Sequence, residues 1–144
     1  MVSVERSFVV ARSRERVFLY FSDFTNTEQW DPGTVTTTRT DSGPIGAGAT
    51  FHNVSTFRGR TTELDYELTD YQPSSKLVFV GTNKTVTSQD NLVFVGQGQR
   101  TRITYRADFH FHGFAKLAAP LLKAPLEKLA DQTVAQIRSM IEQL

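Results

Sequence analysis

The stretch from Pro125 to Leu144 constrains the fold of this chain more than any other. Its apolar residues recur at spacings of three and four, with charged and amide side chains between them, which predicts an amphipathic helix. At about 1.5 Å per residue, such a helix spans about 30 Å, the width of a small domain. Its apolar face consists of Leu126, Leu129, Thr133, Val134, Ile137, Met140, Ile141 and Leu144. Because most of the preceding chain has the pattern of strands, we expect this helix to lie across a curved antiparallel sheet.

Length and charge limit the class of protein. A chain of 144 residues predicts a single domain covering residues 1–144. The net charge of +1, with both signs interspersed, offers no electrostatic footprint for nucleic acid. No window approaches about 18 apolar residues, so we expect no membrane span, and the first residues have no apolar stretch of signal-peptide length. The absence of cysteine excludes disulfides and thiolate metal sites and fits a cytoplasmic protein.

A first strand is predicted over residues 2–10, where apolar residues occupy most even positions. Arg6 falls on the same inward face, between Val4 and Phe8. A charge in that place needs a partner, a ligand or a route to water. Two interpretations stay open: Arg6 reaches solvent near a strand end, or it faces a ligand.

Two short helices are expected next. Ser13 suits a helix N-cap, and Glu15 in the first turn suits the helix dipole. The spacing in residues 25–28 is that of a capping box, which predicts a second helix. Trp30-Asp31-Pro32-Gly33 ends it, because proline disfavours helix at the preceding residue and glycine permits a turn.

A threonine-rich strand over residues 35–41 leads into the glycine-rich loop 43–48. This loop lacks the lysine–serine/threonine pair and the following helix of a phosphate-binding loop. We expect a flexible turn, with a place at a cavity mouth as the alternative.

Strands over residues 49–57 and 60–70 form a predicted hairpin around Arg58-Gly59. That turn pairs Phe57 with Arg60, Ser55 with Thr62, Asn53 with Leu64, Phe51 with Tyr66, and His52 with Asp65 on the outer face. Asn53, Ser55 and Thr62 then lie on the buried side among apolar residues. Such a mixture is typical of a ligand cavity, and it also fits polar residues at the open end of a sheet.

After a uniformly apolar strand at residues 77–80, two more strands cover residues 86–95 and 101–111. Pairing Phe94 with Ile103 places Leu92 opposite Tyr105 and Asp90 opposite Ala107, all facing inward with Phe109. By the same parity Asp90 points into a pocket, or it is a turn or edge residue. His110 and His112 alternate outward without a third ligand nearby, so we expect no metal site.

Residues 114–123 are helical in pattern but contain Pro120, and Pro125 follows. We therefore expect a short or bent lead-in to the long helix, with Leu117, Leu121, Leu122 and Leu126 covering one end of any cavity. Contact of this apolar, lysine-bearing stretch with a membrane surface is the alternative.

The order of these elements and several short motifs resemble the START-like, polyketide cyclase/dehydrase-type superfamily, also called SRPBCC or Bet v 1-like. The motifs are Val17-Phe18, Trp30-Asp31-Pro32-Gly33, the Gly43–Gly48 loop, Phe57-Arg58-Gly59-Arg60 and Thr101-Arg102-Ile103-Thr104-Tyr105. The resemblance covers nearly the whole chain. It implies an α+β helix-grip fold: a seven-stranded antiparallel sheet around the C-terminal helix, two short helices between the first two strands, and a hydrophobic cavity. Its members include ligand carriers, hormone receptors, aromatase/cyclases and lipid-transfer domains, without a shared catalytic signature.

The first functional hypothesis is a non-catalytic binder of a small hydrophobic molecule, lipid-, polyketide- or steroid-like. We expect a monomer or weak homodimer without cofactor. The predicted ligand-binding residues are Trp30, Phe51, Asn53, Ser55, Tyr66, Phe94, Tyr105, Phe109, Leu121 and Leu129. A structure without a cavity of about 300 Å³ or more would count against this hypothesis.

The second hypothesis is a polyketide cyclase, aromatase or dehydratase, for which the inward titratable groups are Arg6, Tyr66, Asp90 and Tyr105. An Asp90–tyrosine pair within hydrogen-bond reach would favour it, and a purely apolar pocket would not. A third hypothesis is an interaction or chaperone-like domain with a filled core. The outward Val93 and Val95 are the residues that favour the third hypothesis.

Overall fold

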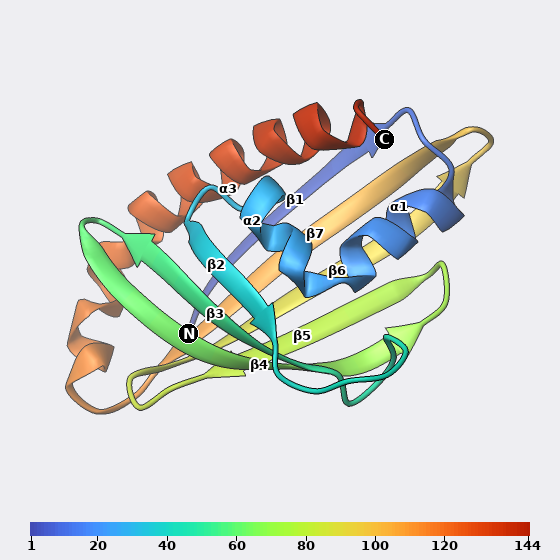
Figure 1. Ribbon diagram of the computed structural model, residues 1–144. Helices are drawn as coiled ribbons and strands as arrows, with labels where there is room; N and C mark the ends of the chain where they lie inside the picture. The colour runs from blue at the N-terminus through green and yellow to red at the C-terminus, as the bar shows by residue number, and fades with distance from the viewer.

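The structure, a computed structural model, describes residues 1–144 and places seven strands in one antiparallel sheet (Figure 1). The order across the sheet is β1-β7-β6-β5-β4-β3-β2. The elements are β1 (Val2–Val10), α1 (Arg14–Ser22), the 3-10 helix η1 (Phe24–Asn26), α2 (Thr27–Trp30), β2 (Thr34–Arg39), β3 (Thr50–Phe57), β4 (Arg60–Gln72), β5 (Lys76–Thr82), β6 (Val86–Gln97), β7 (Arg100–Phe111), the 3-10 helix η2 (Gly113–Ala118) and α3 (Ala119–Ile141).

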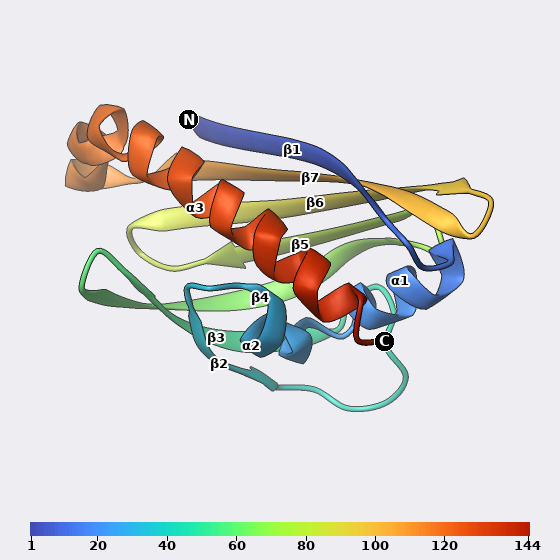
Figure 2. The ribbon, with the colours of Figure 1, turned by 90° about the horizontal axis from the view of Figure 1, so that it is seen from above.

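The long helix α3 crosses the inner side of the sheet, which curves around it (Figure 2). The short helices α1, η1 and α2 lie between β1 and β2 in the chain and so connect the two edges of the sheet. The predicted helix-grip fold is therefore confirmed.

Both predicted hairpin registers are confirmed. In β3–β4, Phe57 lies opposite Arg60 and Phe51 opposite Tyr66. In β6–β7, Asp90 lies opposite Ala107. Because side chains alternate between faces along a strand, these registers put the predicted inward residues on the side that faces α3.

The long helix begins earlier than predicted. α3 starts at Ala119, and Pro120 occupies its first turn, where the missing N–H would have no helical partner in any case. Pro125 lies inside the helix and removes the bond that a residue there would donate to the carbonyl of Leu121. Leu121 is 74% exposed, so that carbonyl is in a hydrated part of the helix.

The leucines that face the sheet differ in part from those predicted to do so. The residues of α3 that face inward recur from Leu122 through Leu126 to Leu129, at helical spacing. Leu117 and Leu121 lie outside that stripe and are 78% and 74% exposed, so they do not cover the end of a cavity as expected. Phe114, Leu117 and Leu121 are instead the three most exposed large apolar side chains of the chain. Val93 and Val95 are exposed as their parity predicted.

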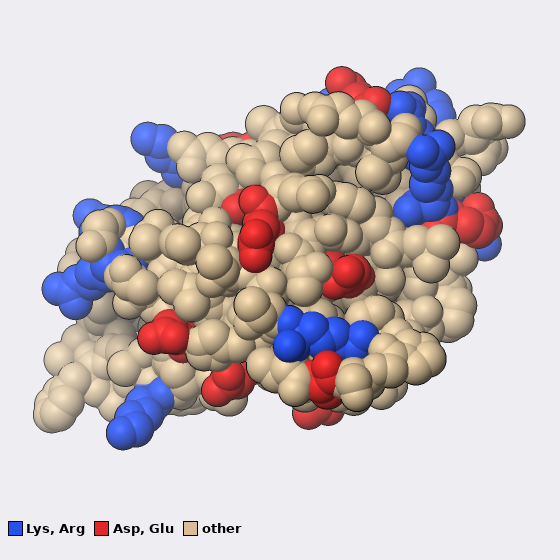
Figure 3. Space-filling model, in the orientation of Figure 1, with Lys and Arg blue, Asp and Glu red and all other residues tan.

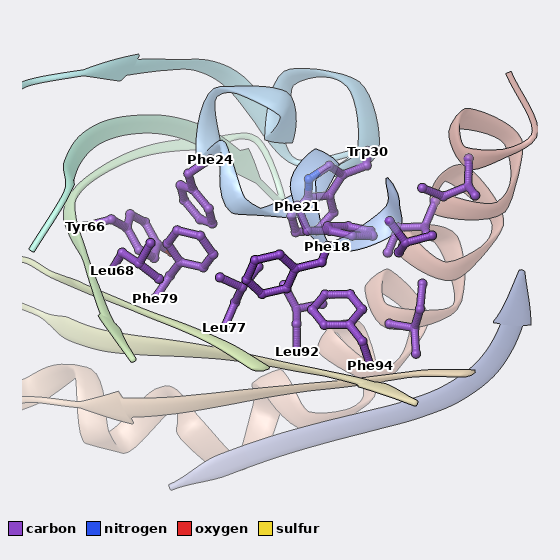
Figure 4. Packing of buried hydrophobic residues seen from close by; sticks show 14 of the residues in the cluster. Phe18, Phe21, Phe24, Trp30, Tyr66, Leu68, Leu77, Phe79, Leu92 and Phe94 are labelled. Atoms are coloured by element: carbon purple, nitrogen blue, oxygen red, sulfur yellow. The ribbon is translucent and has the colours of Figure 1, made fainter. Parts of the chain in front are cut away.

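Most aromatic residues fill one end of the space between sheet and helices. Figure 4 shows Phe18, Phe21 and Trp30 from the short helices packed towards sheet residues such as Phe94 and Leu92. Ile137 and Ile141 of α3 close this aromatic core from the other side. Towards the opposite end the buried residues are fewer and smaller, namely Val2, Val4, Ala107 and Leu126.

Charged residues are dispersed over the outer surface. Figure 3 shows basic and acidic side chains scattered over the face presented there. No helix is long and apolar enough to cross a membrane.

Candidate functional site

A cavity of about 200 Å³ lies beyond the aromatic core, between the sheet and the first half of α3. This volume is below the roughly 300 Å³ set above for the binding hypothesis, which counts against a ligand of drug size. Most of the lining is apolar and consists of Val4, Phe57, Leu64, Val86, Ala107, Phe109, Phe111, Leu122, Leu126, Leu129 and Ala130. The remaining lining residues carry hydroxyl or carboxyl groups or are glycine: Asp31, Gly33, Ser55, Thr56, Thr62, Tyr66, Ser88, Asp90, Tyr105 and Thr133.

Strand alternation and helix periodicity place these side chains. Ser88 and Asp90 are two residues apart on β6, and Tyr105, Ala107 and Phe109 alternate in the same way on β7. Each set therefore points to one face of the sheet. The small side chains of Ser88 and Ala107 leave space there that larger residues occupy at the aromatic end.

The chemically distinctive group is the carboxyl of Asp90. It is 7% exposed, and the Tyr105 hydroxyl donates a hydrogen bond of 3.2 Å to its Oδ1. Burial, and next the negative charge of Asp31, raise the pKa of Asp90 from 3.8 to about 7, against the opposing effect of the Tyr105 hydrogen bond. The cavity lining contains no lysine, arginine or histidine to compensate the carboxylate. Asp90 therefore exchanges its proton near neutral pH.

A second carboxyl, that of Asp31, comes from the turn after α2. It accepts hydrogen bonds from the Gly33 N–H (3.0 Å) and the Thr34 hydroxyl (2.9 Å). Burial raises the pKa of Asp31, and these two hydrogen bonds oppose the shift. The sequence pattern indicated a turn at this aspartate, which is correct, but did not place Asp31 at the site.

Two tyrosines complete the polar cluster. Burial, and next the charge of Asp90, raise the pKa values of Tyr66 and Tyr105 well above 10, so both hydroxyls stay protonated at physiological pH. The Tyr66 ring lies against Gly81 of the neighbouring strand, where a β-carbon would approach the ring within 2.5 Å. Gly81 thus provides the space that Tyr66 occupies.

The predicted ligand-binding residues divide into two groups. The cavity is lined by Ser55, Tyr66, Tyr105, Phe109 and Leu129, and also by Asp90 from the catalytic set. Trp30, Phe51 and Phe94 belong to the aromatic core instead. Asn53 is buried in a hydrogen-bonded group with Thr37, Thr34 and Ser55, and Leu121 is exposed.

Arg6 does not line the cavity. Its guanidinium forms ion pairs with Glu127 (2.9 Å) and Asp131 (2.8 Å), two acids four residues apart on α3. The inward parity of Arg6 was therefore right, but its partners are side chains of the covering helix. These pairs tie β1 to the first half of α3.

One buried polar atom has no partner. The Trp30 indole Nε1 is the only buried side-chain nitrogen or oxygen without a hydrogen bond. Its ring stands edge-on to Tyr105, with 6.1 Å between the ring centroids. Trp30 therefore packs against Tyr105, the residue whose hydroxyl donates a hydrogen bond to Asp90.

Metal ligands do not cluster in this structure. No three histidine, aspartate or glutamate side chains are placed so that they could hold a metal ion together. His112 instead lies 2.9 Å from the Thr87 hydroxyl.

Comparisons with known proteins agree with this architecture. A structure of the Zhui aromatase/cyclase from Streptomyces sp. R1128 is similar with a TM-score of 0.81 at 15% identity, covering 98% of this chain and 93% of that one. A START superfamily protein from Mycobacterium smegmatis is similar with a TM-score of 0.82 at 14% identity, covering 98% and 97%. The structure of Ara h 8.0201 is similar with a TM-score of 0.69 at 12% identity, covering 99% of this chain and 98% of that one. Identities this low show a shared fold alone.

The sequence itself carries the family assignment. No curated protein matches it. The family described as "Polyketide cyclase / dehydrase and lipid transport" matches residues 1–142, nearly the whole chain. The protein therefore belongs to the polyketide cyclase/dehydrase and lipid transport family.

Proposed function

We propose that the protein binds a small, largely apolar molecule in the cavity and orients one polar group of it against Asp90, Tyr66 and Tyr105. The observation that carries this proposal is an apolar space that ends in a buried polar cluster without a cation. Burying a carboxyl group without a compensating charge opposes folding, and perturbed carboxyls of this kind concentrate at functional sites.

The volume limits the size of the ligand. A dry cavity of about 150 Å³ accepts benzene, whereas drug-sized ligands occupy about 300–1,000 Å³. At about 200 Å³ the cavity suits one or two rings or a short chain. Each 100 Å² of apolar ligand surface removed from water contributes about 2.5 kcal/mol to binding.

Native mass spectrometry of the protein purified from its own source, followed by denaturing extraction, tests the proposal. We expect a reproducible added mass that extraction releases. Ala107→Phe puts a ring into the cavity and should abolish the added mass while the protein stays folded. Ala135→Phe makes the same substitution on an exposed position of α3 and serves as the matched control. An added mass retained by Ala107→Phe would place the ligand elsewhere and overturn the proposal.

A second candidate function is acid–base catalysis of the cyclase or dehydratase type. The observation that favours it is the 3.2 Å contact between Asp90 and Tyr105, with a pKa of Asp90 of about 7. In a dehydration, the Asp90 carboxylate would take a proton from the carbon next to a carbonyl whose oxygen accepts a hydrogen bond from a tyrosine. The carboxyl would then return the proton to the departing hydroxyl, which leaves as water. Arg6, engaged by two acids of α3, has no part in this scheme.

Turnover of the compound recovered from the protein separates the two candidates. An enzyme should show a rate that changes around pH 7, and Asp90→Asn should lose turnover by about a hundredfold or more while it still binds. Tyr20→Phe, which removes a hydroxyl on the outer side of α1, is a control outside the cavity. Equal rates for Asp90→Asn and the unmodified protein would leave binding as the function.

A further inference from the structure

A second space adjoins the cavity on the outside. This outer groove, about 330 Å³, is lined by Pro32, Gly33, Thr56, Phe57, Arg58, Pro125, Lys128, Leu129 and Gln132. Gly33, Thr56, Phe57 and Leu129 line both the groove and the cavity, so the two spaces meet at these residues. The groove is therefore the nearest surface hollow to which a ligand in the cavity could extend.

The outer groove carries two unpaired positive charges. Arg58 at the tip of the β3–β4 hairpin and Lys128 on α3 are its charged residues, and neither makes an ion pair or a side-chain hydrogen bond. The acids nearest to Lys128 in sequence, Glu127 and Asp131, are turned to the other side of α3 and pair with Arg6. No acidic residue lines the groove to pair with these two charges.

Arg58 also occupies a backbone conformation that does not suit it. Its φ is +54°, and Gly59 follows at +78°, the left-handed pair of a hairpin turn that favours asparagine, aspartate or glycine. At the β6–β7 turn the corresponding left-handed residue is a glycine, Gly98, with φ +68°. Ser74 in the β4–β5 turn has a similar φ of +60°, so the conformation alone does not mark a site; at Arg58 it coincides with an unpaired charge in the groove.

We propose that the outer groove binds the carboxylate of an amphipathic acid whose apolar body occupies the cavity. This inference rests on the proposed binding function and names the class of ligand. The two ends of the combined space have opposite electrostatic character. Asp90 at the inner end would repel an anion, and no cation lines the cavity to compensate it. Arg58 and Lys128 at the outer end can pair with it, so the carboxylate stays in the groove and the group that reaches Asp90, Tyr66 and Tyr105 is polar but uncharged.

Isothermal titration calorimetry with 3-(6-hydroxy-2-naphthyl)propanoate and its primary amide tests the inference, because the ring hydroxyl supplies the uncharged polar group for the cavity end. The two probes have nearly the same shape and differ in charge. We expect the acid to bind about fivefold more tightly than the amide at low salt, the effect of two exposed ion pairs, and the preference to shrink at about 1 M salt. The double variant Arg58→Gln/Lys128→Gln should remove the preference and leave the amide affinity within about twofold.

Arg16→Gln/Arg100→Gln is the matched control. It makes the same change of net charge on α1 and at the β6–β7 turn, the opposite end of the sheet from the β3–β4 hairpin (Figure 1). This variant should keep the preference for the acid. Arg58→Asn gives a second readout, because asparagine suits the left-handed turn: we expect a higher Tm by about 2–4 °C together with a weaker preference for the acid.

Three results would overturn the inference. Equal affinity of the unmodified protein for acid and amide would do so, as would an acid preference that survives in Arg58→Gln/Lys128→Gln. Both leave the binding function intact, because the amide still binds in the cavity. Binding of neither probe would overturn the proposed function as well.

Discussion

The two ends of the space under α3 contrast in how they are filled. At the aromatic end β6 presents Leu92 and Phe94, which are 0% and 2% exposed and pack against the short helices. Towards the other end the same strand presents Ser88 and Asp90 to a cavity. One strand with one inward face thus serves both a close-packed core and a hollow site. The two ends differ because the inward side chains of β6 are larger at the aromatic end, and because α1 and α2 pack against that end.

The comparison shows why stability and ligand binding are separable in this fold. The aromatic end supplies interdigitated apolar contacts, which contribute to stability in proportion to the area that they bury. The cavity end leaves space open and buries two carboxyls, both unfavourable for folding. Truncating a side chain should therefore cost more stability at the aromatic end than on the cavity wall, and neutralising a buried carboxyl at the cavity end should raise stability.

The largest effect is expected from Asp90→Asn, which should stabilise the cavity end. The pKa of Asp90 is raised from 3.8 to about 7 in the folded state, so folding favours its protonated form. The stability of the unmodified protein is then fully present below about pH 4 and falls as the pH rises towards 7, in total by about 2–4 kcal/mol. The Asp90→Asn variant should lack this dependence. Denaturant unfolding of both proteins between about pH 4 and pH 8 measures this pH dependence of stability. Parallel pH profiles for the two proteins would contradict the raised pKa of Asp90.

Matched leucine truncations compare the two ends directly. Leu92→Ala in the aromatic core should cost about 3 kcal/mol of unfolding free energy, because a fully buried side chain leaves a new void. Leu122→Ala on the cavity wall should cost about 1 kcal/mol, since one side of that leucine already faces empty space. Urea unfolding provides the measurement. Equal losses would mean that the cavity end is packed as tightly as the core.

Gly81→Ala should act on the cavity through its neighbour. The added β-carbon would approach the Tyr66 ring within 2.5 Å, so the ring must move. We expect a loss of about 1–2 kcal/mol in stability together with weaker binding of cavity ligands. Gly46→Ala has open space around its β-carbon and serves as the control. Unchanged binding by Gly81→Ala would show that the position of Tyr66 does not matter for the ligand.

The smallest effect concerns how α3 is fastened at each end. Ion pairs from Arg6 hold its first half, whereas Ile137 and Ile141, both fully buried, hold its second half. Arg6→Gln should accelerate amide hydrogen exchange in the first half of α3 and leave the second half unchanged. High salt should reduce the difference between variant and unmodified protein, because exposed ion pairs are screened. Equal acceleration of hydrogen exchange in both halves of α3 would contradict the idea that Arg6 holds only the first half.

Strand alternation made most of the fold predictable, and the limits are equally specific. The register that places Asp90 opposite Ala107 follows from the hydrophobic pattern and is confirmed. Parity states which face a residue occupies but not which end is hollow, so Phe51 and Phe94 were placed in a site when they belong to the core. That distinction depends on where the short helices dock, which is a tertiary property.

Helix phase and charge partners were harder to predict. Leu121 is in the predicted site, but Leu122 faces the cavity. The predicted short lead-in is present as η2, which ends at Ala118, but α3 begins at Ala119 and continues through Pro125, and the sequence does not give its phase. Inward parity makes Arg6 a catalytic candidate, and the sequence does not reveal its partners, because Glu127 and Asp131 are 121 and 125 residues away along the chain. Asp31 was missed because an aspartate before Pro-Gly has a sufficient explanation in the turn itself.

Trp30 gives the protein an intrinsic optical reporter. It is the single tryptophan of the chain, is 2% exposed, and stands edge-on to Tyr105. Indole emission depends on the polarity around the ring and on hydrogen bonds to its nitrogen, and here that nitrogen has no partner. Proton exchange at Asp90, or a ligand that shifts Tyr105, should therefore change the emission of an unlabelled protein. Occupancy of the cavity can thus be followed by fluorescence without any added dye.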